Sequence, residues 1–194
     1  MAVRRGEAHA AGIHLLDTET GEYNRKYIRK YFPHGGVYLV RCVGRQQGLM
    51  LQKGNPLGIK RFADIAGEGV RYVNRQKGSG TRILTDYLCQ REGVEPDRVY
   101  GYEREEVTHN AVAVQIAGGS ADAGMGIYSA AKLYDLDFLP ICVEEYDLLI
   151  PGSVWNTGLV RQLIRTLKSE AFRDRIEAMG GYTLDRPGEI IDVF

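Results

Sequence analysis

Short apolar runs alternate with amphipathic stretches along most of the chain, and this pattern predicts its secondary structure. Runs of strand length occur at residues 12–16, 37–43, 48–51, 70–73, 99–102, 121–127, 138–141 and 146–150. We assign helices to residues 23–31, 59–65, 81–92, 111–116, 130–133 and 159–179. The polar segment at residues 45–48 interrupts the apolar stretch between the run at 37–43 and the run that ends at residue 51. Such an interruption predicts a β-bulge or a hinge. Because strands and helices alternate, we expect an α/β fold with mostly parallel sheets.

A glycine-rich turn between a predicted strand and a predicted helix is the most informative local feature. Gly78 and Gly80 allow the backbone to bend tightly and to approach a ligand. Ser79 and Thr81 are residue types that cap helices, and their hydroxyls can donate hydrogen bonds. The first N–H groups of the helix that follows have no partners within that helix. This arrangement predicts an anion-binding site at the turn.

Three cations surround the same turn, namely Arg75, Lys77 and Arg82. The positive end of a helix dipole disfavours cations, so we expect a negative group to lie among them. The alternative is an ordinary strand-to-helix turn whose basic side chains are solvated. The sequence leaves both interpretations open.

A second polar segment, Glu105–Asn110, joins another predicted strand to the next helix. Thr108 and Asn110 are suitable helix caps, and His109 can donate to an anion. Both turns follow strands of an alternating pattern, so we expect them at the same edge of a sheet, where the hydroxyl of Tyr128 after the next strand would join them. The two glutamates that open the segment would repel a bare anion. An acid-rich cap that complements the helix dipole is therefore the alternative.

Composition narrows the functional classes. The 25 basic residues balance the 25 acidic ones, which does not indicate a general nucleic-acid or membrane surface. Cys42, Cys89 and Cys142 are too widely spaced for a zinc pattern, so we expect reduced thiols, no metal and no cofactor. No apolar run is long enough to span a membrane, and the first residues lack a signal-peptide core. We therefore expect a cytoplasmic protein.

Several motifs together resemble a known family. They are the segments Arg4–Ala8, Ala11–Asp17, Arg45–Met50, Gly54–Pro56, Val73–Arg82, Glu105–His109 and Ala121–Ile127. This combination resembles the periplasmic-binding-protein-like domain that is fused to molybdopterin-biosynthesis proteins or to helix-turn-helix regulators. The resemblance implies a type 2 periplasmic-binding-protein-like fold, in which two α/β lobes joined by two crossing strands hold a ligand. It divides the chain into a first lobe of residues 1–51 and 147–194 and a second lobe of residues 52–146.

The resemblance also implies a ligand class and a set of site residues. Carriers of molybdate and tungstate share this fold, so the implied ligand is a tetrahedral oxyanion. Ser79, Gly80 and Thr81 would supply hydrogen-bond donors. Arg75 or Arg82 would supply the countercharge. By position alone, the resemblance adds His14, Thr108, His109 and Tyr128.

One departure from the family concerns the first lobe. The family has a strand and a helix before the segment that matches Arg4–Ala8, and this first strand and helix are missing from the chain. An unpaired, buried sheet edge is costly. We therefore expect a second copy of the chain, a partner chain or another segment to cover an open sheet position.

Three functions compete. The first is a non-catalytic sensor that binds an oxyanion such as molybdate or tungstate and signals to a fused or associated DNA-binding or molybdenum-cofactor protein. The second is a binding domain for a pterin or a sugar-like metabolite. The ring of such a ligand would stack on tyrosines such as Tyr146. The third is an enzyme that acts on a phosphorylated substrate, with His109 as a base. We do not expect an enzyme, because the turn is neither a Walker A loop nor a nucleophile elbow.

Overall fold

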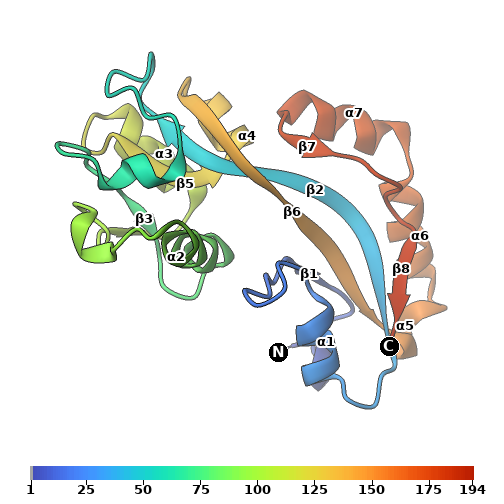
Figure 1. Cartoon of the computed structure of the whole chain (residues 1–194). Coiled ribbons are helices and arrows are strands. Elements are labelled where there is room, and N and C mark those ends of the chain that lie inside the picture. Colours follow the sequence, from blue (N-terminus) through green and yellow to red (C-terminus); the bar gives the residue numbers. More distant parts are fainter. Residues whose placement is uncertain (1) are drawn as a thin grey trace. The chain divides into compact units, whose positions relative to one another are not determined.

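The computed structural model describes residues 2–194, which form two compact α/β units (Figure 1). Unit 1 contains the residues up to Arg45 together with Glu144–Phe194, and unit 2 contains Gln46–Val143. Two long strands, β2 (Val37–Leu51) and β6 (Asp137–Pro151), each contribute to both units. Each of these strands joins two of the predicted apolar runs across a polar interruption. The mixed α/β architecture confirms the predicted fold class.

The larger sheet departs from the expectation of mostly parallel strands. Its order is β1–β6–β2–β5, and β7 (Tyr182–Thr183) and β8 (Ile190–Val193) also pair with β2. The ladders of β1 (Ala11–Ile13) with β6, and of β2 with β5 (Ala123–Ile127), β7 and β8, are antiparallel. Parallel pairing joins β3 (Asn74–Arg75) to β4 (Glu105–Glu106), and a parallel bridge joins Tyr72 to Ala123. Each of these two parallel pairings joins segments between which the chain passes through at least one helix.

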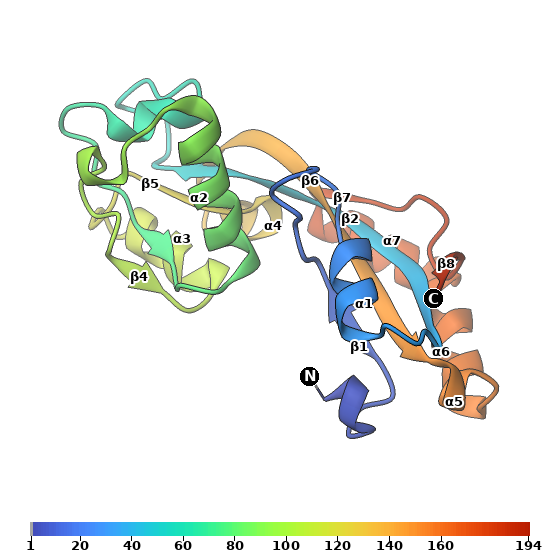
Figure 2. The same ribbon diagram turned by 60° about the horizontal axis from the view of Figure 1, so that its bottom comes forward.

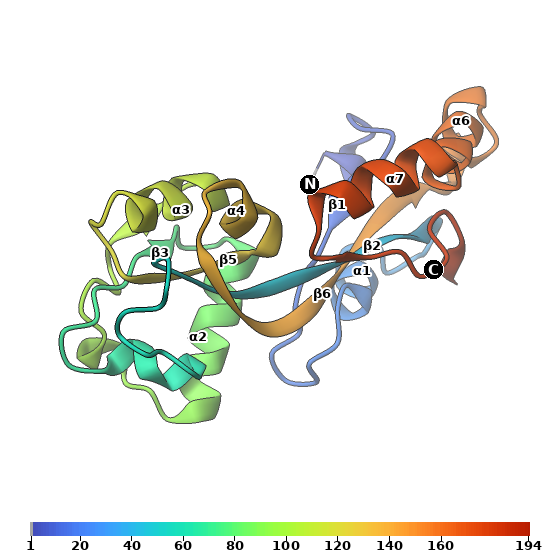
Figure 3. The same ribbon diagram turned by 90° about the horizontal axis from the view of Figure 1, so that it is seen from above.

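Unit 1 packs helices on both faces of its strands. Figure 3 shows α1 (Arg25–Tyr31) on one side of β2 and β6 and α6 (Gly158–Leu167) with α7 (Glu170–Met179) on the other. Because side chains alternate along a strand, Val37 and Leu39 of β2 pack in one core with Ile28 of α1. Val40 packs in the opposite core with Val160 and Leu167 of α6. Figure 2 shows α1 close to β1.

The predicted helix over residues 159–179 is wrong, because α6 and α7 are separate helices. The Ser169 hydroxyl accepts a hydrogen bond from the N–H of Phe172 at 3.2 Å and donates one to the carbonyl of Thr166 at 2.7 Å. This hydroxyl caps α7 and satisfies a carbonyl at the end of α6. Unit 1 also contains the short helix α5 (Gly152–Trp155) and a 3-10 turn at Val3–Arg5.

Unit 2 holds the helices that carry most of the candidate residues. Figure 3 shows α3 (His109–Ala117) and α4 (Tyr128–Leu133) on one side of β5 and α2 (Gly80–Glu92) on the other. The core under α3 and α4 contains Met50, Val73, Val112, Ala113, Ile116, Ala121, Ala130 and Ala131. Small residues are needed in β5, because a Cβ on Gly124 would lie 2.6 Å from Val112 Cγ1.

Two predicted elements of unit 2 differ in type. The helix expected at residues 59–65 is a 3-10 helix at Phe62–Ala66. The strand expected at residues 99–102 is a turn that follows the 3-10 helix Pro96–Arg98, and β4 forms three residues later. Gly101 has a φ of 93°, a left-handed value that is incompatible with an extended strand. The turn also lets Gly101 approach the carbonyl of Tyr72, where a Cβ would lie 2.2 Å from the oxygen.

Within residues 2–194, the helices are too short or too polar for any of them to cross a membrane.

Candidate functional site

Two helices of unit 2 begin directly after two neighbouring parallel strands. Asn74 of β3 pairs with Glu105 of β4, and Arg75 pairs with Glu106. The chain leaves β3 for α2 and leaves β4 for α3. The carboxyl ends of parallel strands lie at the same edge of a sheet, so the N-termini of α2 and α3 share one edge. This confirms that the two turns lie at the same sheet edge, while the expected place of the Tyr128 hydroxyl beside them stays a prediction.

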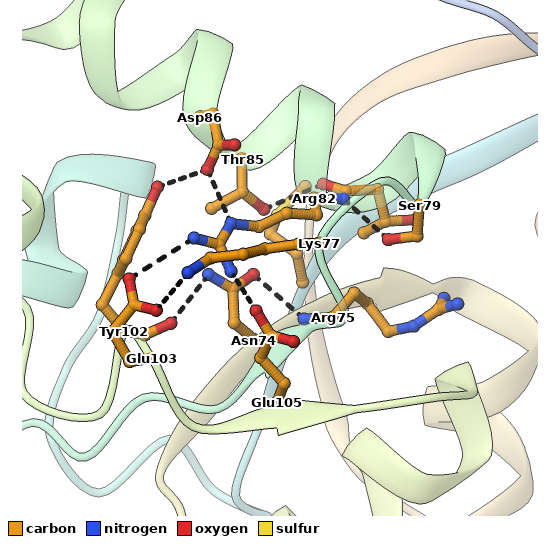
Figure 4. Close-up of polar contacts among 12 residues, drawn as sticks. Asn74, Arg75, Lys77, Ser79, Arg82, Thr85, Asp86, Tyr102, Glu103 and Glu105 are labelled. Atoms are coloured by element: carbon orange, nitrogen blue, oxygen red, sulfur yellow. Dashed lines mark hydrogen bonds and ion pairs between the residues drawn. The ribbon is translucent and has the colours of Figure 1, made fainter.

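The start of α2 has the predicted capped turn (Figure 4). Gly78 has a φ of 85°, which only glycine adopts without strain, so the chain can turn sharply there. The Ser79 hydroxyl accepts a hydrogen bond from the N–H of Arg82 at 3.2 Å. The N–H groups of Gly80 and Thr81 precede the first intrahelical bonds and are therefore available to an acceptor outside the helix.

The start of α3 is capped in the same way. The Thr108 hydroxyl accepts a hydrogen bond from the N–H of Ala111 at 3.0 Å. The first turn of α3 has no acidic residue, and the Glu106 carboxylate instead accepts from the Gln115 amide at 2.7 Å. The residue that caps α3 is thus Thr108, and the idea that the two preceding glutamates complement the helix dipole stays a prediction. His109 is the first residue of this helix.

The cation Arg82 points away from the turn and toward acidic residues of the same unit (Figure 4). Its Nε donates to Asp86 at 2.7 Å, and its Nη1 donates to Glu105 at 2.9 Å. Its Cζ lies 4.6 Å from the centroid of the Tyr102 ring. Burial disfavours the charge, but the hydrogen bond and the charge of Asp86 outweigh it and raise the pKa of Arg82.

The other two cations also have partners within the chain. Lys77 Nζ donates to Glu103 at 2.7 Å, and this hydrogen bond raises the pKa of Lys77 and lowers that of Glu103. The guanidinium of Arg75 donates to the carbonyls of Glu106 and Val107 at 3.3 and 2.8 Å. The negative groups that the sequence led us to expect therefore include the chain's own carboxylates. The cation cluster does not by itself require a bound anion.

The Thr81 side chain has a partner that the sequence did not indicate. Thr81 is 1% exposed, and its hydroxyl and the side-chain amide of Gln47 lie within hydrogen-bond distance, at 3.1 and 3.3 Å. Gln47 belongs to β2 and is fully buried. Its position in a polar interruption of an apolar strand was the only sign in the sequence, where it predicted a bulge or a hinge. The structure has a register shift of β2 between Leu39 and Val40 and not at residues 45–48. The two units divide between Arg45 and Gln46, so the alternative of a hinge at this segment stays a prediction.

Tyr128 begins α4, after β5. Its ring contacts the edge of the Phe138 ring, with the centroids 5.4 Å apart. Tyr128 is half-buried and belongs to unit 2, as do the candidates of α2 and α3.

His14 belongs to unit 1, where it joins a compact polar cluster. Its ring stacks on Tyr146, with the centroids 5.2 Å apart, and its Nδ1 lies 3.4 Å from Oε2 of Glu144. Glu144 is 2% exposed and forms an ion pair with Arg45. The Arg45 guanidinium lies over the ring of Tyr146, with its Cζ 5.1 Å from the ring centroid. The sequence pointed to His14 and Tyr146 but not to Glu144 or Arg45.

Sequence comparison identifies a family and a relative. The family model of the PBP superfamily domain matches residues 1–168. The uncharacterized protein YvgK of Bacillus subtilis (strain 168) is 35% identical over 187 residues, which cover 96% of this chain and 60% of YvgK. The chain thus spans less than two thirds of the length of this relative.

Solved structures share the fold at low identity. A substrate-binding domain of a putative molybdenum ABC transporter from Clostridium difficile has a TM-score of 0.61, with 12% identity, 84% coverage of this chain and 75% of that one. A phosphate transport receptor from Vibrio cholerae has a TM-score of 0.57, with 13% identity, 95% coverage of this chain and 83% of that one.

Proposed function

Because the chain belongs to the PBP superfamily, a family of ligand-binding domains, we propose that it is a sensor for a small oxyanion such as molybdate or tungstate. The proposed site lies in unit 2, at the edge where α2 and α3 begin. Binding rather than catalysis is the proposed activity.

The observation that carries the proposal is the pair of capped helix N-termini after parallel strands. The Ser79 and Thr108 hydroxyls accept one N–H each, and the amides of Gly80 and Thr81 at the start of α2 and of Asn110 at the start of α3 are left for a ligand. Two positive helix ends at one sheet edge favour negative charge. Oxyanions offer several acceptor atoms in a compact shape, which suits amides that converge from two directions.

The charge balance refines the proposed mode of binding. Arg82 and Lys77 are paired with carboxylates, and Arg75 is engaged by backbone carbonyls. In our proposal, the backbone amides and the Ser79 hydroxyl therefore bind the anion directly. Arg75 adds positive charge near the site without contacting the anion. This replaces the expected role of Arg82 as a countercharge.

Two structural neighbours support an oxyanion as the ligand class. One is described as part of a molybdenum transporter and the other as a phosphate receptor. We further propose a cytoplasmic setting and a link to molybdenum-cofactor metabolism or to transcriptional regulation. In this proposal, a fused or associated protein receives the signal.

A second candidate ligand is an organic molecule such as a pterin or a sugar-like metabolite. The observation that favours it is the stack of His14, Tyr146 and Arg45 in unit 1, which offers an aromatic surface beside a cation. A ligand with a planar ring would use this surface, whereas molybdate would not.

Calorimetric titration of the protein with molybdate, tungstate, sulfate and phosphate tests the proposal. We expect saturable binding of at least one of these anions, with one site per chain. Titration with a pterin tests the second candidate. If none of the four anions binds, the proposed ligand class is wrong.

Two serine variants separate binding from stability. Ser79→Ala and Ser169→Ala each remove a cap hydroxyl that accepts an N–H at 3.2 Å, one on α2 and the other on α7. Both should lower the free energy of unfolding by about 1 kcal/mol. Only Ser79→Ala should also weaken anion binding, by about tenfold or more, because it removes a donor to a charged acceptor. Equal affinities in the two variants would place the ligand elsewhere.

A further inference from the structure

Strand β2 is anchored on each side of the division between the units. Arg45 is the last residue of unit 1 on this strand, and Gln46 is the first of unit 2. Arg45 is held within unit 1 by Glu144 and Tyr146. Gln47 is held within unit 2 by Thr81. A single residue, Gln46, separates the two anchored positions.

The anchor in unit 2 reaches deep into that unit. The Thr85 hydroxyl donates to the carbonyl of Thr81 at 2.9 Å and is hydrogen-bonded to the hydroxyl of Tyr72. The Tyr72 hydroxyl in turn accepts from the N–H of Met125 in β5 at 3.3 Å. All of these side chains are buried. A buried, satisfied network is rigid, because any movement that breaks one bond leaves a polar group without a partner.

We propose that Gln47 is a positioning residue that couples occupancy of the α2 N-terminus to strand β2. The inference rests on the proposed function, because Thr81 supplies one of the amides of the proposed site. The same residue thus contacts the ligand through its backbone and Gln47 through its side chain. A bound anion restricts the first turn of α2, and the Gln47 side chain carries this restriction to the segment of β2 that leads to Arg45.

In unit 1, the restricted motion of β2 acts on the contacts that Arg45 makes with Glu144 and Tyr146. Glu144 is the first residue of unit 1 on strand β6 and is 2% exposed. It pairs with Arg45 and lies 3.4 Å from His14. A change in the backbone of β2 at Arg45 therefore acts on a buried carboxylate of the second long strand, whose loss of partners would be costly.

Hydrogen exchange with and without the anion tests the inference. Molybdate is the first probe, and tungstate, sulfate and phosphate follow. In the wild-type protein, we expect the anion to slow exchange in peptides covering the start of α2 and in peptides covering residues 44–48. Gln47→Leu should keep the slowing at α2 and lose most of it at 44–48, with affinity weakened about tenfold or less.

The matched control is Gln46→Leu, which makes the same change one residue earlier at a half-buried position. This variant should preserve the slowing of exchange both at the start of α2 and at residues 44–48. Thr81→Val removes the hydroxyl but keeps the amide and the shape, and should behave like Gln47→Leu. Thr81→Ser keeps the hydroxyl and should restore the coupling, which a loss of packing alone would not explain.

The outcomes distinguish the two proposals. Retained slowing at residues 44–48 in both Gln47→Leu and Thr81→Val would overturn the coupling role while leaving the proposed function in place. Failure of the wild-type protein to bind any of the four anions would overturn the proposed function and the coupling role with it. Thr81→Val keeps the inference testable if Gln47→Leu does not fold.

Discussion

A hydroxyl at the start of a helix can serve the helix or a ligand, and in this protein the two candidate hydroxyls at the start of α2 are already engaged within the chain. Ser79 accepts the N–H of Arg82, and Thr81 is bonded to Gln47. The same is true of the charges, since Arg82 lies among the carboxylates of Asp86, Glu103 and Glu105 and against the ring of Tyr102. The chemistry left for a ligand at α2 is therefore mostly that of backbone amides, which any sequence would supply.

The carboxylate of Asp122 accepts three hydrogen bonds from one residue of unit 2, Arg71. Its two oxygens accept from Nε, Nη2 and the backbone N–H of Arg71 at 2.9, 2.7 and 2.8 Å. Asp122→Asn should lower the free energy of unfolding at pH 7 by about 2 kcal/mol. Asp135→Asn is the control, because Asp135 is 84% exposed and pairs with an exposed lysine, so its loss should cost less than about 1 kcal/mol. Urea unfolding measures both.

The effect of Asp122 should also depend on pH. The hydrogen bonds from Arg71 lower the pKa of Asp122 below its ordinary value of 3.8. A lowered pKa means that the stabilisation is fully present above the ordinary value and is lost as the pH falls through the folded-state pKa. The difference between wild type and Asp122→Asn should therefore shrink below pH 3.8. A difference that stays constant on acidification would contradict this account.

The predicted strands and helices differ from the observed ones mostly where contacts between distant residues decide the structure. The sequence left open whether residues 48–51 continue the strand at 37–43 or pair with it, and it suggested two strands over 138–150. Gln47 and Glu144 are buried with partners, and both β2 and β6 continue without a break. The long C-terminal helix breaks at Ser169 because its hydroxyl is a better cap than a helix interior residue. The Ser-Glu pair at 169–170 carries this cap signal, so the break could have been predicted.

The close approach of β2 and β6 in unit 2 depends on one glycine. A Cβ on Gly48 would lie 2.2 Å from the carbonyl oxygen of Leu139. Gly48→Ala should therefore separate the two backbones and lower the free energy of unfolding by about 1–3 kcal/mol. Gly158→Ala is the control, since a Cβ there meets nothing within 4 Å and should change stability by less than about 1 kcal/mol. A tolerated Gly48→Ala would mean that the strands can shift apart without cost.

At the scale of the whole molecule, two units are connected by continuous strands, and each has its own core. Eight of the candidate site residues belong to unit 2, from Arg75 to Tyr128, and His14 belongs to unit 1. The prediction of lobes at 1–51 with 147–194 and at 52–146 stays a proposal about which parts move together when a ligand binds.

Strand β1 is the end strand of the larger sheet and pairs with β6. We keep the prediction that a second copy of the chain, a partner or another segment covers this edge. Sedimentation over a range of concentrations should give a species heavier than the monomer, or a dye that reports exposed apolar surface should bind the monomer. A monomer that binds no such dye would argue against a missing partner.

Local chemistry alone determined the alternation of strands and helices, the bend at Gly78 and the caps at Ser79 and Thr108, because each depends on residues close in sequence. The tertiary structure decided what those residues are used for. Arg82 was identified as a cation near a helix start, but its partners Asp86 and Glu105 come to it from the same helix and from the next strand. Gln47 meets Thr81 across 34 residues of sequence, a distance at which no local pattern operates. Burial then makes each such pairing obligatory, since a polar group inside the protein must find its partner there.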